Sequence, residues 1–215
     1  MTYLELVNKV LVRLREDTVS TVGGNAYSSL VGEFVNDAKE FIENAWDWSA
    51  LRQTITIPTT ASDYTYSLTG AGQLSEVKTV TNDTANTFMA YRDQDWFEQQ
   101  LYINGSVEGV PVNYTYNGID GSGDAQVMVY PIPDDVYSLR FKTILRTGLL
   151  SSDSDTIKIP TMPVIHLATA FAARERGETG GTSAAELFGI ADKALADAIA
   201  LDAARHPEEL IYVAV

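Results

Sequence analysis

The side chains that most often perform chemistry are few and scattered in this sequence. Two histidines occur, His166 and His206, and neither has a histidine partner one helical turn away. His166 stands among Ile165, Leu167 and Phe171, a setting typical of a packing histidine rather than a catalytic base or a metal ligand. His206 follows a helical stretch, where the helix dipole favours a cation. Neither histidine therefore predicts a catalytic site.

Acidic pairs are the next candidates, because a glycosidase needs two carboxyl groups about 5–9.5 Å apart across a cleft. The best-placed acids are Asp93, Asp95, Asp134 and Asp135, but such pairs arise by chance in a chain with 29 acidic residues. The segment 118–124 (GIDGSGD) loosely resembles a calcium loop, yet it lacks the EF-hand spacing and the closing glutamate. We therefore expect a solvated hairpin loop there and no metal site.

Motifs for other chemistry are absent from the sequence. It contains no GxxxxGKS/T or GxGxxG phosphate loop and no GxSxG nucleophile elbow. It contains no cysteine, which excludes disulfides and thiolate metal sites. We therefore predict that the protein is not an enzyme, and that it holds no metal and no cofactor.

Net charge is the strongest global signal of the chain. The 29 acidic and 15 basic side chains give a net charge of -14, and the excess is spread along the whole length. An acidic surface repels phosphate, so tight binding of nucleic acid is not expected. The charge serves solubility, or it lines a surface past which DNA slides without sticking. No apolar run approaches the roughly 18–20 residues that span a bilayer, so no membrane partner is expected.

The elements that must position any site follow the order helices, strands, helices. The stretch 45–58 (AWDWSALRQTITIP) marks the first change, where helical spacing gives way to strict alternation. Helices are expected over 2–16 and 27–47, and a short helix capped by Asp93 over 93–101. After a short strand at 157–159, Thr161 is expected to cap a further helix that has Pro163 in its first turn. Strands are expected over 52–57, 64–68, 76–81, 87–91, 112–116, 126–130 and 137–146.

The second helix and the last helix are amphipathic. The apolar face of the second consists of Leu30, Phe34, Ala38, Phe41, Ile42 and Ala45, and its polar face of Glu33, Asp37, Lys39, Glu40 and Glu43. The last helix carries a narrow alanine-rich stripe that includes Ala191, Ala194 and Ala198, which suits close packing against another helix.

The chain ends in an uncharged, β-prone segment. It follows the helix-stopping Pro207 and consists of Leu210, Ile211, Tyr212, Val213, Ala214 and Val215. Exposed to water, such a segment is an aggregation hazard. Two interpretations remain open: the segment docks on its own sheet, or it adds to a partner as a strand or peg.

These patterns predict an α+β fold. Residues 1–51 and 160–206 form one helical domain, 52–159 form an inserted antiparallel β-sandwich or barrel, and 207–215 form an extended tail.

The order of these parts resembles the head-to-tail adaptors of tailed bacteriophages, of the tail tubular protein A-like or gatekeeper type. The resemblance rests on two amino-terminal helices, the aromatic pair Trp46 and Trp48, an immediate strand, a β module, and a final pair of helices with a tail. It covers nearly the whole chain as an order of elements. At residue level it is specific only around 30–51 and 160–202.

The resemblance implies a structural virion protein, made in the host cytoplasm and placed at the head-tail junction. It implies a homo-oligomeric ring, typically a dodecamer, between the portal protein and a tail, nozzle or other neck protein, with double-stranded DNA passing through unbound. The portal contact would fall on the tail segment that begins at Leu210. Adjacent copies would meet through Glu33, Asp37 and Glu40 of the second helix and Ala191, Ala194 and Ala198 of the last.

Two other functions stay open at this stage. One is a carbohydrate-binding or tail-fibre-associated β module that uses aromatic side chains, among them Trp46, Trp48, Trp96, Tyr64, Tyr66, Tyr114 and Tyr116. The other is a small hydrolase that uses an acid pair.

Overall fold

The computed structural model describes residues 1–177 and 183–205. The chain divides into two compact units, one formed by Met1–Leu51 with Thr147–Val215 and the other by Arg52–Arg146. Helices from both ends of the sequence build the first unit, and a sheet of seven strands dominates the second. The predicted α+β class with a central β module is confirmed.

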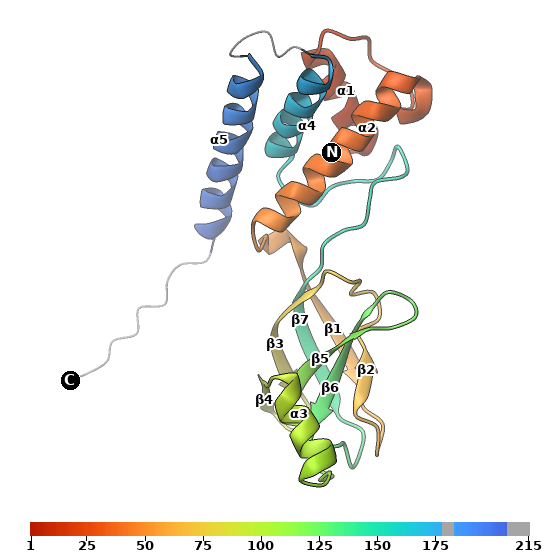
Figure 1. Cartoon of the computed structure of the whole chain (residues 1–215), viewed down its shortest axis with the longest axis vertical. Helices are drawn as coiled ribbons and strands as arrows, with labels where there is room; N and C mark the ends of the chain where they lie inside the picture. The colour runs from red at the N-terminus through yellow and green to blue at the C-terminus, as the bar shows by residue number, and fades with distance from the viewer. Residues whose placement is uncertain (178–182, 206–215) are drawn as a thin grey trace, which may run out of the picture. The chain divides into compact units, whose positions relative to one another are not determined.

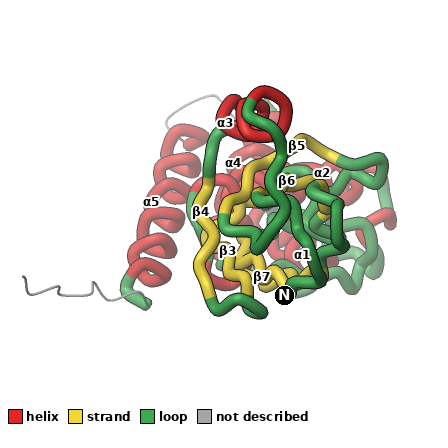
Figure 2. Tube along the Cα trace, turned by 90° about the horizontal axis from the view of Figure 1, so that it is seen from below, coloured by secondary structure: helices red, strands yellow, loops and turns green. Residues whose placement is uncertain are grey.

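The helical unit is organised around α4. It contains α1 (Tyr3–Arg13), η1 (Val22–Gly24), α2 (Ala26–Ala45), α4 (Thr161–Glu175) and α5 (Ser183–Ala203). The helix α4 packs against each of the other three α-helices, and it lies between α5 and α2 in both ribbon views (Figure 1 and Figure 2). The unit is therefore a layered bundle in which α2 and α5 flank the same central helix.

Local side-chain bonds fix where α1 and α2 begin. The Thr2 hydroxyl accepts from the Glu5 amide at 3.2 Å while the Glu5 carboxylate accepts from the Thr2 amide at 2.9 Å. Asn25 and Ser28 repeat this reciprocal arrangement at the start of α2. Each capping box satisfies amides that the first helical turn cannot pair, so both starts are encoded within four residues.

The β unit is a sheet that curls into a nearly closed barrel. Its strands are β1 (Arg52–Pro58), β2 (Thr65–Ser67), β3 (Glu76–Asn82), β4 (Thr87–Tyr91), β5 (Asn113–Ile119), β6 (Ala125–Tyr130) and β7 (Ser138–Ile144), paired in the order β1-β7-β3-β4-β5-β6-β2. The hydrophobic core of this unit includes Leu68, Val80, Val127, Val129, Leu139 and Phe141.

One strand pair departs from the predicted antiparallel pattern. The strands β4 and β5 pair in parallel, whereas every other pair in the sheet is antiparallel. A parallel pair needs a long crossover connection, and here it contains α3 (Gln94–Glu98) and the π-helix η3 (Gln99–Ile103). The predicted cap is confirmed, because the Asp93 side chain accepts from the Trp96 amide at 2.9 Å. Phe97 from α3 is buried against Met128 and Tyr130.

Two local expectations are wrong. Residues 157–159 form no strand, since only Thr156 makes an isolated bridge, to Thr2, while Ile157 and Ile159 are buried in irregular chain. Pro160 rather than Thr161 occupies the N-cap of α4, and no side chain caps that helix. Proline fixes the backbone just outside the helix, so Thr161 becomes the first helical residue.

The faces of α2 also differ from the prediction. Lys39 and Glu43, expected on the polar face, are each 2% exposed, whereas Phe41, expected on the apolar face, is 58% exposed. Ala45, also expected on the apolar face, is exposed. The buried face is rotated because a polar backbone segment, rather than an apolar surface, covers Lys39 and Glu43.

Candidate assembly surfaces

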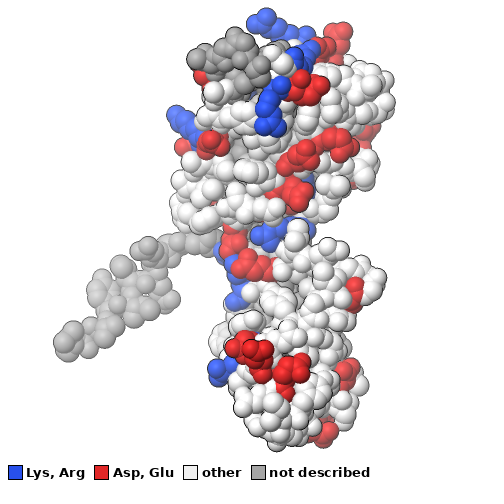
Figure 3. Space-filling model, viewed as in Figure 1, with Lys and Arg blue, Asp and Glu red and all other residues white. Residues whose placement is uncertain are grey.

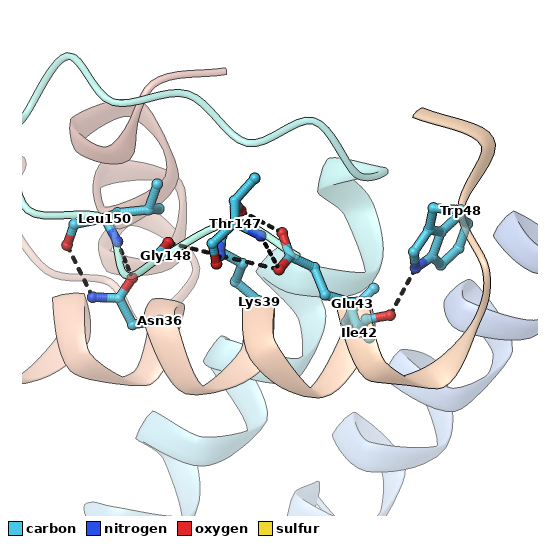
Figure 4. A network of polar contacts seen from close by, with 8 residues as sticks. All are labelled: Asn36, Lys39, Ile42, Glu43, Trp48, Thr147, Gly148 and Leu150. Atoms are coloured by element: carbon cyan, nitrogen blue, oxygen red, sulfur yellow. Dashed lines mark hydrogen bonds and ion pairs between the residues drawn. The ribbon is translucent and has the colours of Figure 1, made fainter. Parts of the chain in front are cut away.

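A buried polar clamp joins α2 to the chain that returns from the last strand (Figure 4). Asn36, Lys39 and Glu43 recur three and four positions apart, which aligns them on one side of the helix. The Lys39 ammonium donates to the carbonyl oxygens of Thr147 at 2.8 Å and Gly148 at 3.0 Å. The Glu43 carboxylate accepts from the Thr147 hydroxyl at 2.6 Å and from its amide at 3.1 Å.

The same clamp continues along α2. The Leu150 amide donates to the Asn36 side-chain oxygen at 2.9 Å, and the Asn36 amide group donates back to the Leu150 carbonyl at 3.1 Å. Lys39 and Glu43 also form an ion pair of 3.3 Å. Because every buried charge here has partners, the clamp fixes residues 147–150 on the helical unit without leaving an unpaired charge.

The tryptophan pair closes α2 and ties it to α5. Trp48 is 1% exposed, and its indole donates to the Ile42 carbonyl at 2.8 Å, which satisfies one of the oxygens that the last helical turn leaves unpaired. The Trp46 indole donates to the Asp202 carboxylate at 3.2 Å. The aromatic pair that carries the sequence resemblance therefore has a structural role in this unit.

Asp202 anchors the carboxy-terminal end of α5. Its carboxylate accepts from the Ser49 hydroxyl at 2.5 Å and from the Ser49 amide at 2.9 Å, and it lies 3.6 Å from Arg205. Burial alone would raise the pKa of the Asp202 carboxyl. The donors on Ser49 and Trp46 and the charge of Arg205 outweigh burial, so this pKa lies below its ordinary value. The end of α5, from which the tail continues, is thus held by a buried carboxylate.

The predicted assembly residues fall into three groups: exposed, buried or half-buried within the chain, and outside the described residues. Glu33, Asp37 and Glu40 are exposed, and Figure 3 shows a row of acidic side chains over α2. Ala191 and Ala198 are buried within the chain and Ala194 is half-buried, because α5 packs on α4. The predicted portal-binding residues, Leu210, Ile211, Tyr212, Val213, Ala214 and Val215, lie outside the described residues, as does His206.

Three of the four candidate catalytic acids, Asp93, Asp134 and Asp135, accept local hydrogen bonds. The Asp134 carboxylate accepts from the Tyr137 hydroxyl at 2.6 Å, and the Asp135 carboxylate accepts from the Val136 amide at 2.7 Å. In the loop 118–124, the Asp120 carboxylate accepts from backbone amides at 2.8 and 2.9 Å. Among the described residues, no group of three or more His, Cys, Asp or Glu is arranged to hold a metal ion.

The aromatic side chains of the β unit are mostly engaged in its own packing. Tyr114 is 6% exposed, and its ring lies edge-on to Phe141 at 6.2 Å. Trp96 meets the ring of Tyr130 at 5.5 Å and 90°. Tyr116 accepts from the Val77 amide at 2.7 Å. Each of these three side chains is thus engaged in a contact within the β unit.

Sequence reasoning missed both the clamp and the Asp202 anchor. The spacing of Asn36, Lys39 and Glu43 was visible, but it also fits a solvated face. Asp202 is one acid beside an alanine-rich stripe, and nothing local relates it to Ser49. Each arrangement becomes apparent only when segments more than 100 positions apart are brought together, such as Lys39 and Thr147, which are 108 positions apart.

Comparison with protein families identifies the chain. The family model described as SU10 adaptor protein matches residues 1–210, which includes both units. No curated protein matches the chain. In the ranges 1–177 and 183–205, no helix combines the length and hydropathy needed to cross a bilayer.

Proposed function

The chain belongs to the SU10 adaptor protein family, and from this premise we propose that it forms a ring beneath the portal that joins the capsid to the tail. Family membership makes it a structural phage protein and a component of the virion. The finer proposal concerns its neighbours: a homo-oligomeric ring, expected to be dodecameric, with the portal protein above and a tail, nozzle or other neck protein below. The match over residues 1–210 is the observation that carries this proposal.

The ring's lumen would form part of the DNA channel. A net charge of -14 disfavours the multiple phosphate contacts on which DNA binding depends. Acidic groups that face a channel repel the duplex and let it pass in either direction. DNA is therefore a transient passenger in this proposal rather than a ligand, and no cofactor or catalytic step is required.

The portal contact is assigned to the tail residues Leu210, Ile211, Tyr212, Val213, Ala214 and Val215. Their apolar, uncharged character suits insertion into a groove or addition to a sheet edge of a partner. The buried Asp202 carboxylate supports this assignment, because it holds the end of α5 only a few residues before the tail begins.

The test is a measurement of mass and shape with and without the portal. Light scattering and negative-stain images of the purified protein, alone and mixed with the portal protein of the same phage, should reveal a ring with a central channel in at least one sample. Deletion of 210–215 should abolish attachment to the portal while the circular dichroism spectrum and the melting temperature stay unchanged. A full-length protein that stays monomeric beside the portal would overturn the proposal.

A further inference from the structure

The helix α5 carries an apolar seam along one edge of the face that packs on α4. Leu187, Ile190, Ala194 and Leu201 follow the three-and-four spacing of a helix-packing seam. Ile190 is 47% exposed and Leu201 is 73% exposed. Leu187 and Ala194 are half-buried. In a folded chain such a seam is ordinarily covered by another helix.

Basic residues stand beside this seam at both of its ends. Leu187 and Ile190 line an open hollow of about 550 Å³ together with Arg13 and Arg15 from the end of α1 and with His166, Thr169 and Ala173 of α4. Near the other end of α5, a groove of about 350 Å³ is lined by Leu201, Arg205 and Lys158 among others. Cations therefore stand near both ends of the seam, while the exposed Asp197 interrupts its apolar residues between Ala194 and Leu201.

Arg15 occupies a backbone conformation that would suit glycine better. Its φ is 60°, in the left-handed region, just after α1 ends. The Glu16 amide donates to the Leu11 carbonyl at 2.9 Å and the Arg15 amide to the Val12 carbonyl at 3.1 Å, the pattern that commonly ends a helix with glycine. A charged side chain kept where it costs about 1 kcal/mol or more points to a role for that side chain.

The exposed face of α2 has the complementary charge. Glu33, Asp37 and Glu40 recur four and three positions apart and are all exposed. Like charges at this spacing repel one another and weaken the isolated helix. Phe41 stands beside them, 58% exposed. This face would gain from a partner that brings cations and an apolar surface.

The two faces lie on different flanks of one helical layer. The Phe171 ring of α4 lies 6.4 Å from Phe34 of α2 and 5.9 Å from Phe188 of α5, so α4 separates the two helices. Figure 1 shows the same order of α5, α4 and α2. Two different faces that meet between copies form a heterologous contact, which generates a ring where the rotation between copies closes.

We propose that the acidic face of α2 in one copy docks on the seam of α5 in the next copy. Glu33 and Asp37 would face Arg13 and Arg15, and Phe41 would enter the hollow that Leu187 and Ile190 line. This inference rests on the proposed ring and names its subunit interface. The occupant of the hollow is a second copy of this chain.

A charge-swap experiment on the full-length protein tests the pairing. Ring formation on the portal is measured by light scattering and negative stain for Asp37→Lys, for Arg15→Glu and for a single chain that carries both changes. Each single reversal should weaken assembly about tenfold or more, in line with the coupling measured for close interfacial charge pairs. The doubly changed chain should recover most of it, because every interface then carries the reversed pair.

Matched controls separate this interface from general charge effects. Lys142→Glu and Glu98→Lys reverse exposed charges in the β unit and should leave ring formation unchanged. Arg15→Gly should raise the melting temperature of the monomer and still weaken the ring, which separates the side chain's role from folding. Circular dichroism verifies that every variant is folded.

The outcomes distinguish the inference from the proposed function. Wild-type protein that forms no ring overturns the proposed function. If the wild-type protein forms rings and both single variants assemble equally well, only the proposed interface is overturned. Loss of assembly in Arg15→Glu with no effect of Asp37→Lys, or no recovery in the double variant, overturns α2 as the occupant and points to the portal or the chain's own tail.

Discussion

Lys39 and Glu43 form an ion pair of 3.3 Å in which each side chain is only 2% exposed. Both also bond to Thr147, Lys39 to its carbonyl oxygen and Glu43 to its amide and hydroxyl. The pair therefore does more than join two turns of α2. It neutralises two buried charges while it holds the segment that follows the β unit.

Removal of one partner should be more harmful than removal of both. Lys39→Met leaves Glu43 as a buried charge without its cation, and we expect a loss of about 3–5 kcal/mol in the free energy of unfolding. The double variant Lys39→Met, Glu43→Leu should lose less than Lys39→Met alone, because no buried charge is then left unpaired. Urea unfolding measures all three.

A surface pair provides the control for this measurement. Lys78 and Glu76 are also paired, but their side chains are 37% and 46% exposed. Glu76→Gln should change the free energy of unfolding by less than about 1 kcal/mol, because solvent screens exposed charges. Equal losses from Lys39→Met and Glu76→Gln would contradict the buried clamp.

The order of helices and strands was predictable because the spacing of apolar residues within each segment already distinguishes a helix from a strand. Arg52 to Ile57 alternate as a strand must, and the cap at Asp93 precedes its helix within three residues. Burial of Lys39 and Glu43 was not predictable, because it depends on Thr147, 104 positions beyond Glu43. For the same reason the parallel pairing of β4 with β5 was missed, since short strands with turn residues between them favour an antiparallel reading.

The residues of the candidate assembly surfaces also differ in how far local sequence predicts them. The exposure of Glu33, Asp37 and Glu40 follows from a polar helix face. By contrast, the burial of Ala191 and Ala198 depends on which helix α5 meets, and the alanine stripe alone fits a neighbour in the same chain as well as a neighbouring copy. The anchoring role of Asp202 depends on its position against Ser49, which no local pattern encodes.

The Asp202 anchor should make the end of α5 sensitive to acid. The folded-state pKa of Asp202 lies below the unfolded value of about 3.9, so its contribution is present above that pH and is lost as pH falls through the folded pKa. Asp202→Asn should lower the free energy of unfolding by about 1–3 kcal/mol at pH 7. The difference from wild type should shrink as pH falls below about 4.

Asp197 supplies the matched control for that variant, since it lies on the same helix but is exposed. Asp197→Asn should have little effect at pH 7 and should not alter the acid dependence. If Asp202→Asn and Asp197→Asn unfold at the same urea concentration at pH 7, the buried anchor contributes nothing to stability.

His166 should produce a second pH dependence, in a range where carboxylates do not titrate. Burial first, and then the charge of Arg13, hold the pKa of His166 below its ordinary value. The unfolded chain therefore binds a proton near pH 6.5 that the folded chain does not, so stability is full above that pH and declines as pH falls through it. In His166→Gln, the urea concentration at the unfolding midpoint should depend less on pH between pH 7 and pH 5.5 than it does in wild type.

Arg13→Gln tests the cause of that dependence. It removes the smaller contribution to the lowered pKa of His166 and leaves burial, so the pH dependence should weaken without disappearing. A pH profile of His166→Gln that matches wild type between pH 7 and pH 5.5 would contradict the assignment to His166.

The close approach of α1 to α2 at Gly32 should not tolerate a side chain. A Cβ at this position would lie 2.5 Å from the Tyr3 hydroxyl oxygen and 2.8 Å from the Val22 Cγ1. Gly32→Ala adds helix propensity worth about 1 kcal/mol, but the overlap costs about 1–3 kcal/mol. We expect a net loss of stability in thermal unfolding.

Gly189 in α5 provides the control for Gly32→Ala, because the same substitution there should change stability in the opposite direction. A Cβ at Gly189 would meet nothing within 4 Å, so Gly189→Ala gains helix propensity without any overlap and should stabilise the monomer by about 0.5–1 kcal/mol. The two substitutions are chemically identical and both lie inside helices. Opposite shifts of the melting temperature would therefore isolate the contact of Gly32 with Tyr3 and Val22, whereas a stabilised Gly32→Ala variant would mean that α1 and α2 are not held this closely.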